Sequence, residues 1–372
     1  MKYYNFGYLP ILALSPAEMA AIEELPGKDR DCMLPLFLLK GWGASSKLSN
    51  SIERIKKSIE GRRWIADIDE GFIDGKKDED GNYPRPVFYE IEELLDADNN
   101  FQKWFEFVSS HENITPTLRY NDSCNEECIK NQANNLYGLG RGLVVRVFMK
   151  TIKPDVFNKI VVALRESFCK EILFLLDYGD IDRSTLVEVE VEENTLLISK
   201  LQSFFPGAIF SISSSSFPNS FSGSYRGEIP IYERQFYNKI VKALPDASFV
   251  YSDRGGARAE KNKGGGGTPP PRIDYPLKND WRFVRKELNE EAGEERKTLY
   301  KEAALEVIKS DYWEPSLALW GTQMIELTSK GDDYGITNPN RATAVRINIH
   351  LYLQLHYHDL IEGLDTDEEW ID

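Results

Sequence analysis

The most constraining feature of this sequence is a series of eight short apolar runs, separated by segments with helical periodicity. Most runs are continuously apolar rather than alternating, which is typical of strands that are covered on both faces. In chain order they are Tyr8–Leu14, Met33–Leu39, Arg63–Asp69, Ile114–Tyr120, Gly142–Phe148, Glu171–Tyr178, Gly207–Ser214 and Ala247–Asp253. Eight strand–helix repeats predict an α/β fold, a (β/α)8 TIM-barrel-like single domain. A doubly wound open sheet is the alternative, because the pattern does not show closure.

The segments between the runs carry apolar residues at helical spacing. The first has the clearest start signal, because Ser15 can cap the helix, Pro16 suits its first position and Glu18 completes a capping box. Further amphipathic helices are expected over Lys47–Glu60, Phe101–Val108, Pro154–Phe168 and Glu233–Leu244.

Composition divides the chain into four parts. Residues 1–254 hold the predicted barrel core, and residues 255–271, rich in Gly and Pro, are expected to form a flexible loop. Residues 272–362 are expected to pack on the barrel as an extended pair of segments followed by helices. Residues 363–372 form an acidic tail. The expected C-terminal elements are Arg272–Arg285, Glu294–Lys309, Pro315–Ser329 and Arg341–Glu362.

Charge and cysteine content restrict the setting. The 45 basic and 60 acidic residues give a net charge of −15, which argues against nucleic-acid or anionic-membrane binding over the whole surface and leaves only a local basic cleft. No signal peptide and no membrane-spanning apolar run is visible. The 4 cysteines lack the spacing of a zinc site. We therefore expect a cytoplasmic protein that does not bind membranes.

Polar and ionisable residues stand where the apolar runs end. In a barrel these ends form the face that carries function, and charged groups there are costly unless they are paired or solvated. The candidate binding residues at these ends are Asp67, Asp69, Arg119, Arg146, Asp177, Asp180, Ser216 and Asp253.

Three interpretations of these strand-end residues remain open. Asp67, Asp69 and Asp177 have the chemistry to hold a divalent cation, and Arg119 and Arg146 have the chemistry to clamp phosphate oxygens. Alternatively, the same groups pair with one another and only close the top of the barrel. The sequence alone does not choose between them.

Three other candidates lie on expected helices. His350 stands four residues after Arg346 on one helix face, where a histidine at the helix surface or at an interface is expected. Glu233 and Arg234 stand at the start of an expected helix, where we expect them to cap the helix and to be solvated charges. No Gly-x-Ser-x-Gly context surrounds Ser213–Ser216, which argues against a serine hydrolase.

The order of several short motifs resembles that of the beta protein family of tailed phages and bacterial genomes. The motifs are Tyr8-Leu9-Pro10-Ile11-Leu12, Leu34-Pro35-Leu36, Leu176-Asp177-Tyr178-Gly179-Asp180, Ser216-Phe217-Pro218, Glu233-Arg234, Asp253, Arg272, Tyr275, Trp281 and Arg346-Ile347-Asn348-Ile349-His350. The resemblance covers nearly the whole chain. It implies a phage or mobile-element setting and a part in phage–host conflict, and it supplies no reaction.

We therefore expect a barrel protein that binds a phosphorylated ligand, a nucleic acid at a local site, or a protein partner at its C-terminal face. Arg119, Arg146, Asp67, Asp177 and Asp253 would line the site. Glu233, Arg234 and Arg272 would form its border, and His350 is a further candidate binding residue. A metal-dependent phosphodiester hydrolase that uses a divalent cation is the alternative. A third possibility is an interaction protein that presents an acidic surface to a basic partner.

Overall fold

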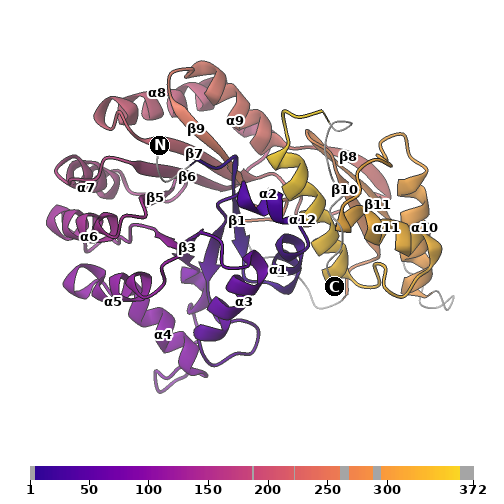
Figure 1. Ribbon diagram of the computed structural model, residues 1–372, viewed down its shortest axis with the longest axis horizontal. Coiled ribbons are helices and arrows are strands. Elements are labelled where there is room, and N and C mark those ends of the chain that lie inside the picture. Colours follow the sequence, from indigo (N-terminus) through magenta and orange to yellow (C-terminus); the bar gives the residue numbers. More distant parts are fainter. Residues whose placement is uncertain (1–4, 187, 222, 260–267, 288–294, 361–372) are drawn as a thin grey trace.

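The computed structural model describes residues 5–186, 188–221, 223–259, 268–287 and 295–360. Eight parallel strands form its central sheet, and helices surround them (Figure 1). The strands are β1 (Tyr8–Ala13), β2 (Leu36–Leu39), β3 (Trp64–Ile68), β4 (Ile114–Pro116), β5 (Leu143–Phe148), β6 (Ile172–Asp180), β7 (Ile209–Ser215) and β9 (Ser248–Asp253). Each lies within or overlaps one of the eight apolar runs, so local apolar character was a sufficient signal for all of them.

The sheet curves into a nearly closed barrel. Its strands follow the order β4-β3-β2-β1-β9-β7-β6-β5, with every neighbouring pair parallel. The two outer strands of this order meet just beyond β4, where Thr117 bridges Val144 of β5 and Leu118 N–H donates to the Val144 carbonyl at 2.8 Å. This contact confirms the predicted (β/α)8 fold, and the open-sheet alternative is wrong.

Helices cover the outside of the barrel. They are α1 (Pro16–Glu23), α2 (Gly27–Asp31), α3 (Ser49–Ile59), α4 (Pro86–Leu95), α5 (Asp98–Ser109), α6 (Glu126–Gly138), α7 (Pro154–Arg165), α8 (Glu188–Phe204) and α9 (Tyr232–Ala243). At the start of α1, Ser15 Oγ accepts from Glu18 N–H, and the Glu18 carboxylate accepts from Ser15 Oγ and Ala13 N–H. Within the described ranges, no helix is long and apolar enough to cross a membrane.

The C-terminal part adds a small antiparallel sheet and three helices beside the barrel (Figure 1). Its elements are β8 (Arg226–Pro230), β10 (Arg272–Pro276), β11 (Asp280–Arg285), α10 (Arg296–Ile308), α11 (Trp320–Lys330) and α12 (Pro339–Leu355). The extended pair and the helices agree with expectation, although α11 begins five residues later. Strand β8 was not expected, because its sequence Arg-Gly-Glu-Ile-Pro has no apolar pattern and becomes a strand by pairing with β11.

Helix α12 and the segment after β9 hold the two parts together. Every residue of α12 from Ala344 to Gln354 is buried, and Asn348 Nδ2 donates to the Ala21 carbonyl of α1 at 2.9 Å. The start of the expected flexible loop is anchored, since Ser215 Oγ donates to the Ala257 carbonyl and Ala259 N–H donates to Asp180. The remainder of that loop at 260–267 and the acidic tail at 363–372 lie outside the described residues.

Candidate functional site at the C-terminal face of the barrel

The charged residues that end β3 to β6 form one continuous network. Asp67 lies between two guanidinium groups: Arg119 Nη1 donates to its Oδ1, and Arg146 Nη1 donates to its Oδ2 at 2.7 Å. Arg146 Nη2 also donates to Asp177 Oδ2 at 2.6 Å. Arg254, just after β9, donates to the same carboxylate at 2.6 and 2.8 Å. Parallel strands end at one edge, which explains why residues so distant in sequence meet here.

This network neutralises its own charge. Burial alone would raise the pKa of Asp67, but the charges of Arg119 and Arg146 outweigh it and hold that pKa below its usual value. Burial likewise acts against ionised Asp177, and Arg254 and Arg146 again bring its pKa below the usual range. The arginines expected to clamp phosphate are thus bound to the aspartates expected to hold a metal. This arrangement corresponds to the third interpretation, in which the groups close the barrel top.

Two further strand-end aspartates lie beside this network rather than within it. Asp69 contacts Lys40 at 3.5 Å, and Asp180 contacts Arg258 at 3.0 Å. In the part of the chain that the structure describes, no group of three or more His, Cys, Asp or Glu side chains is arranged to hold a metal ion. Asp67, Asp69 and Asp177 therefore do not converge as the hydrolase alternative requires.

A second cluster surrounds Asp253 at the end of β9. Its Oδ1 accepts from Tyr8 OH and, at 2.7 Å, from Gly255 N–H. Its Oδ2 accepts from Tyr251 OH at 3.0 Å and lies 2.8 Å from His350 Nε2. The exposed fraction of the His350 side chain is 0%. Of the two expected places, the helix surface or an interface, His350 therefore lies at an interface, the one between α12 and the barrel.

Two neighbours pack closely on the His350 ring. It stacks on Trp281 of β11 with a centroid separation of 5.9 Å. The backbone of Gly256 approaches so closely that an added Cβ would lie 3.1 Å from His350 Cγ. Gly256 also has a φ of +73°, which favours glycine at this position.

Glu233 and Arg234, at the start of α9, were expected to be solvated, but both are buried. Glu233 Oε2 accepts from both Ser216 N–H and Ser216 Oγ. Burial raises the pKa of Glu233 to about 8, so the carboxyl is mainly protonated at neutral pH. Arg234 lies flat against the Tyr251 ring at 3.2 Å and donates to Gln354, which ties α9 to α12.

A third group of charges joins the C-terminal part to the segment after β7. Asp274 of β10 accepts two hydrogen bonds from Arg272, at 2.7 and 2.9 Å, and one from Arg346 Nη1 at 2.8 Å. The Arg346 guanidinium lies 3.9 Å from the Phe217 ring centroid, and that of Arg272 lies 3.6 Å from the Phe221 ring. Two cations thus face one carboxylate.

These last groups adjoin one another, and we call them the junction cluster: Ser216, Phe217, Glu233, Asp253, Arg272, Asp274, Trp281, Arg346 and His350. Phe217 links them, because its ring contacts Trp281 edge-on at 5.3 Å and also faces Arg346. Four buried polar atoms of the cluster have no hydrogen-bond partner among the described residues. They are Glu233 Oε1, Trp281 Nε1, Arg346 Nε and His350 Nδ1.

Buried polar atoms without partners are uncommon in folded proteins and call for an explanation such as a ligand or water. Sequence reasoning had named five members of this cluster as site candidates, namely Ser216, Glu233, Asp253, Arg272 and His350. It missed Asp274, and it treated Trp281 and Arg346 only as parts of the resemblance or of a helix face. Their partners lie tens of residues away, so local patterns could not reveal the cluster.

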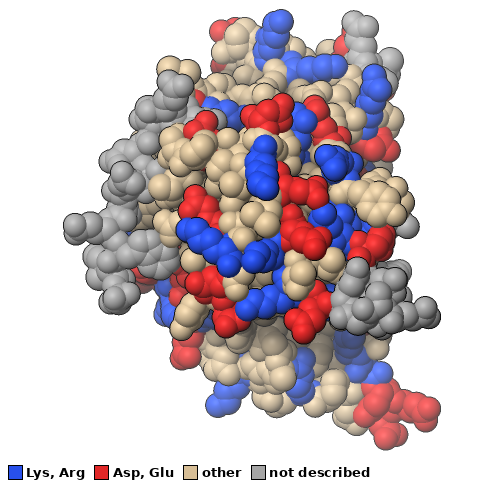
Figure 2. Space-filling model, turned by 90° about the vertical axis from the view of Figure 1, so that its right-hand side faces the viewer, with Lys and Arg blue, Asp and Glu red and all other residues tan. Residues whose placement is uncertain are grey.

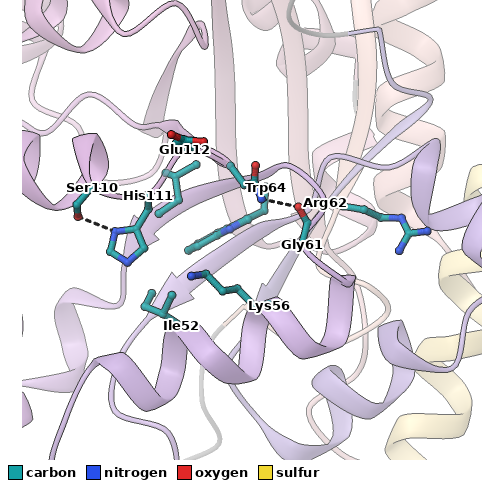
Figure 3. A pocket seen from close by; sticks show the side chains of 10 residues that line it. Ile52, Lys56, Gly61, Arg62, Trp64, Ser110, His111 and Glu112 are labelled. Atoms are coloured by element: carbon teal, nitrogen blue, oxygen red, sulfur yellow. Dashed lines mark hydrogen bonds between the residues drawn. The ribbon is translucent and has the colours of Figure 1, made fainter.

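A separate pocket of about 240 Å³ lies at the opposite end of the barrel (Figure 3). Lys56 of α3, Trp64 at the start of β3 and His111 before β4 line it. Ser110 Oγ lies 3.0 Å from His111 Nδ1. The N-terminal ends of barrel strands contribute to stability rather than to function, so the junction cluster is the better candidate site.

Comparison with known proteins places the chain in a family. The family model described as "Beta protein" matches residues 8–356. "Protein beta" of Enterobacteria phage P4 is 27% identical over 381 residues, covering 99% of this chain and 99% of that protein. The match spans both the barrel and the C-terminal part that form the junction cluster. The chain therefore belongs to the Beta protein family.

Proposed function

We propose that this protein binds a phosphorylated ligand at the junction cluster on the C-terminal face of its barrel, and that this binding serves in phage–host conflict. The observation that carries the proposal is the local charge balance at Arg272 and Arg346. Arg272 and Arg346 share the single carboxylate of Asp274, and Arg346 Nε is buried without a partner.

The burial of these arginines favours an anionic ligand. Burial lowers the pKa of Arg346, although the charge of Asp274 opposes this effect. A guanidinium whose charge is incompletely compensated is costly to bury, and an anion that accepts its remaining N–H groups would offset that cost. Arginine also matches the oxygens of a phosphoryl group with two parallel hydrogen bonds. Arg272, whose side chain is 24% exposed, lies at the more open end of the pair.

The strand-end network of Arg119, Arg146 and Arg254 is a weaker candidate. Its three arginines contact Asp67, Asp177 and Glu70, so its charges balance. A ligand would have to break buried ion pairs to bind there, which is strongly unfavourable.

A small phosphorylated ligand fits better than a nucleic acid. Figure 2 shows the face formed by the C-terminal part, where basic and acidic side chains are interspersed without a continuous stripe of one sign. A nucleic-acid backbone needs an extended basic track. This face therefore does not support the third possibility, in which an acidic surface binds a basic partner.

The setting is inferred from the relative in Enterobacteria phage P4 and from the thiols. The four cysteines, all within described ranges, carry free thiols, which suits a reducing cytoplasm. Defence against phages, or its counter, is the role we propose.

The proposal is tested in bacteria that express the protein. Phage plating efficiency and host growth are measured for the wild type, for Arg272→Gln and for the control Arg226→Gln, whose side chain is 80% exposed on the same small sheet. We expect the wild type and the control to change plating or growth, and Arg272→Gln to lose the effect. A wild type without effect, or an Arg272→Gln variant with full effect, contradicts the proposal.

A further inference from the structure

We propose that His350 and Glu233 act as general base and general acid in hydrolysing a phosphate monoester bound at Arg272 and Arg346. This inference rests on the proposed function and adds a reaction to it. Its basis is that a buried imidazole and a buried carboxyl lie in the same cluster, each with one polar atom that has no partner among the described residues.

His350 has the geometry of a base fixed in one tautomer. The Asp253 carboxylate accepts from Tyr8, Tyr251 and Gly255, and His350 Nε2 lies 2.8 Å from its Oδ2. An ionised carboxylate only accepts, so His350 donates through Nε2–H and leaves the Nδ1 lone pair available. Burial opposes ionisation of Asp253, but its contact with His350 and the hydrogen bonds from the other donors keep its pKa below the usual value.

Glu233 has the properties of an acid. Ser216 occupies Oε2 with two hydrogen bonds, which leaves Oε1 without a described partner. Burial, followed by the nearby charge of Asp253, raises the Glu233 pKa to about 8, although the Ser216 hydroxyl opposes this effect. At neutral pH the carboxyl therefore carries a proton that it can donate.

In the proposed reaction every proton and bond is accounted for by water, the ester and these two side chains. The oxygen of a water molecule attacks phosphorus while its proton passes to His350 Nδ1. The bond from phosphorus to the ester oxygen breaks, and Glu233 protonates that oxygen, so the products are an alcohol and inorganic phosphate. Exchange with solvent then returns one proton from His350 to Glu233. Arg272 and Arg346 stabilise the charge on the phosphoryl oxygens.

Gly256 and Trp281 support this assignment. Both pack closely against the His350 ring and so restrict the direction of Nδ1. A general base must lie within hydrogen-bonding reach of the proton that it removes, so its position is considered before its pKa.

The test uses two model substrates with the full-length protein. Phenyl phosphate has a poor leaving group that needs a proton, whereas p-nitrophenyl phosphate has a good one that does not. We expect Glu233→Gln to lower kcat on phenyl phosphate by roughly 10² to 10⁴-fold and to affect p-nitrophenyl phosphate far less. His350→Asn should lower both rates. Glu112→Gln and His111→Asn, near the opposite end of the barrel, are the matched controls.

Binding of inorganic phosphate, measured by calorimetry, separates the two proposals. Wild-type protein that binds phosphate but hydrolyses neither ester overturns the catalytic inference and leaves the binding proposal intact. Protein that does not bind phosphate overturns both. Equal loss of activity on the two esters in Glu233→Gln would show a structural role and overturn the acid assignment, even if His350→Asn fails to fold.

Discussion

Single side chains explain why so many ionisable groups can be buried in this protein. Asp67, Asp177 and Asp253 stay ionised because arginines, a histidine and backbone or tyrosine donors surround them. Glu233 accepts hydrogen bonds from Ser216 but forms no ion pair with a described residue, and it avoids the cost of a buried charge by holding a proton instead. Burial disfavours the charged form of every carboxyl, yet within the junction cluster Asp253 is ionised and Glu233 is protonated, because their hydrogen-bond partners differ.

Glu233 should make stability depend on pH in a defined direction. Its pKa is raised to about 8 in the folded protein, so its contribution is fully present below about 4.5 and is lost as pH rises through 8. The folded state binds the extra proton in this window, and the free energy of unfolding should fall by up to about 1.4 kcal/mol per pH unit from this group. Urea unfolding between pH 5 and 9 measures it.

Glu233→Gln is the matched variant, because glutamine mimics the protonated carboxyl and does not titrate. It should remove this slope and be more stable than the wild type above pH 8. Glu112→Gln, at an exposed carboxyl, should keep the wild-type slope. A wild-type slope that persists in Glu233→Gln would contradict the raised pKa.

Secondary-structure elements show where prediction from the sequence succeeded. The barrel strands were predicted because each is apolar enough to be recognised alone, and α1 because Ser15, Pro16 and Glu18 lie next to one another. Strand β8 was missed, since pairing with β11 and not its own residues makes it a strand. The positions of the strand-end charges were predicted, and their mutual pairing was one of three open interpretations. The individual partners could not be predicted, because Asp67 and Arg146 are 79 residues apart.

The strand ends are cross-linked by Arg146, whose guanidinium joins β3 to β6. Arg146→Met should cost roughly 3 to 5 kcal/mol of stability, because it leaves Asp67 and Asp177 buried with one fewer partner each. Arg62→Met is the control: its partners Asp31 and Glu60 are largely exposed, so less than about 1 kcal/mol should be lost. Chemical unfolding of both variants measures the difference, and equal costs would refute the network's structural role.

The complete fold explains why the candidate site lies where it does. A closed barrel collects the strand ends of β7 and β9 on one face, and α12 brings Arg346 and His350 onto that face (Figure 1). The small sheet adds Arg272, Asp274 and Trp281. Neither part contains the junction cluster alone, which agrees with a family match that spans residues 8–356.

Calorimetric titration of inorganic phosphate into the wild type, Arg272→Gln and the control Arg226→Gln tests this account most directly. We expect wild type and control to bind alike. Arg272→Gln should bind roughly 10- to 100-fold more weakly, since a charge-assisted hydrogen bond contributes about 1.5 to 3 kcal/mol. Absence of binding in the wild type, or equal affinity in all three proteins, would contradict a phosphate site at the junction cluster.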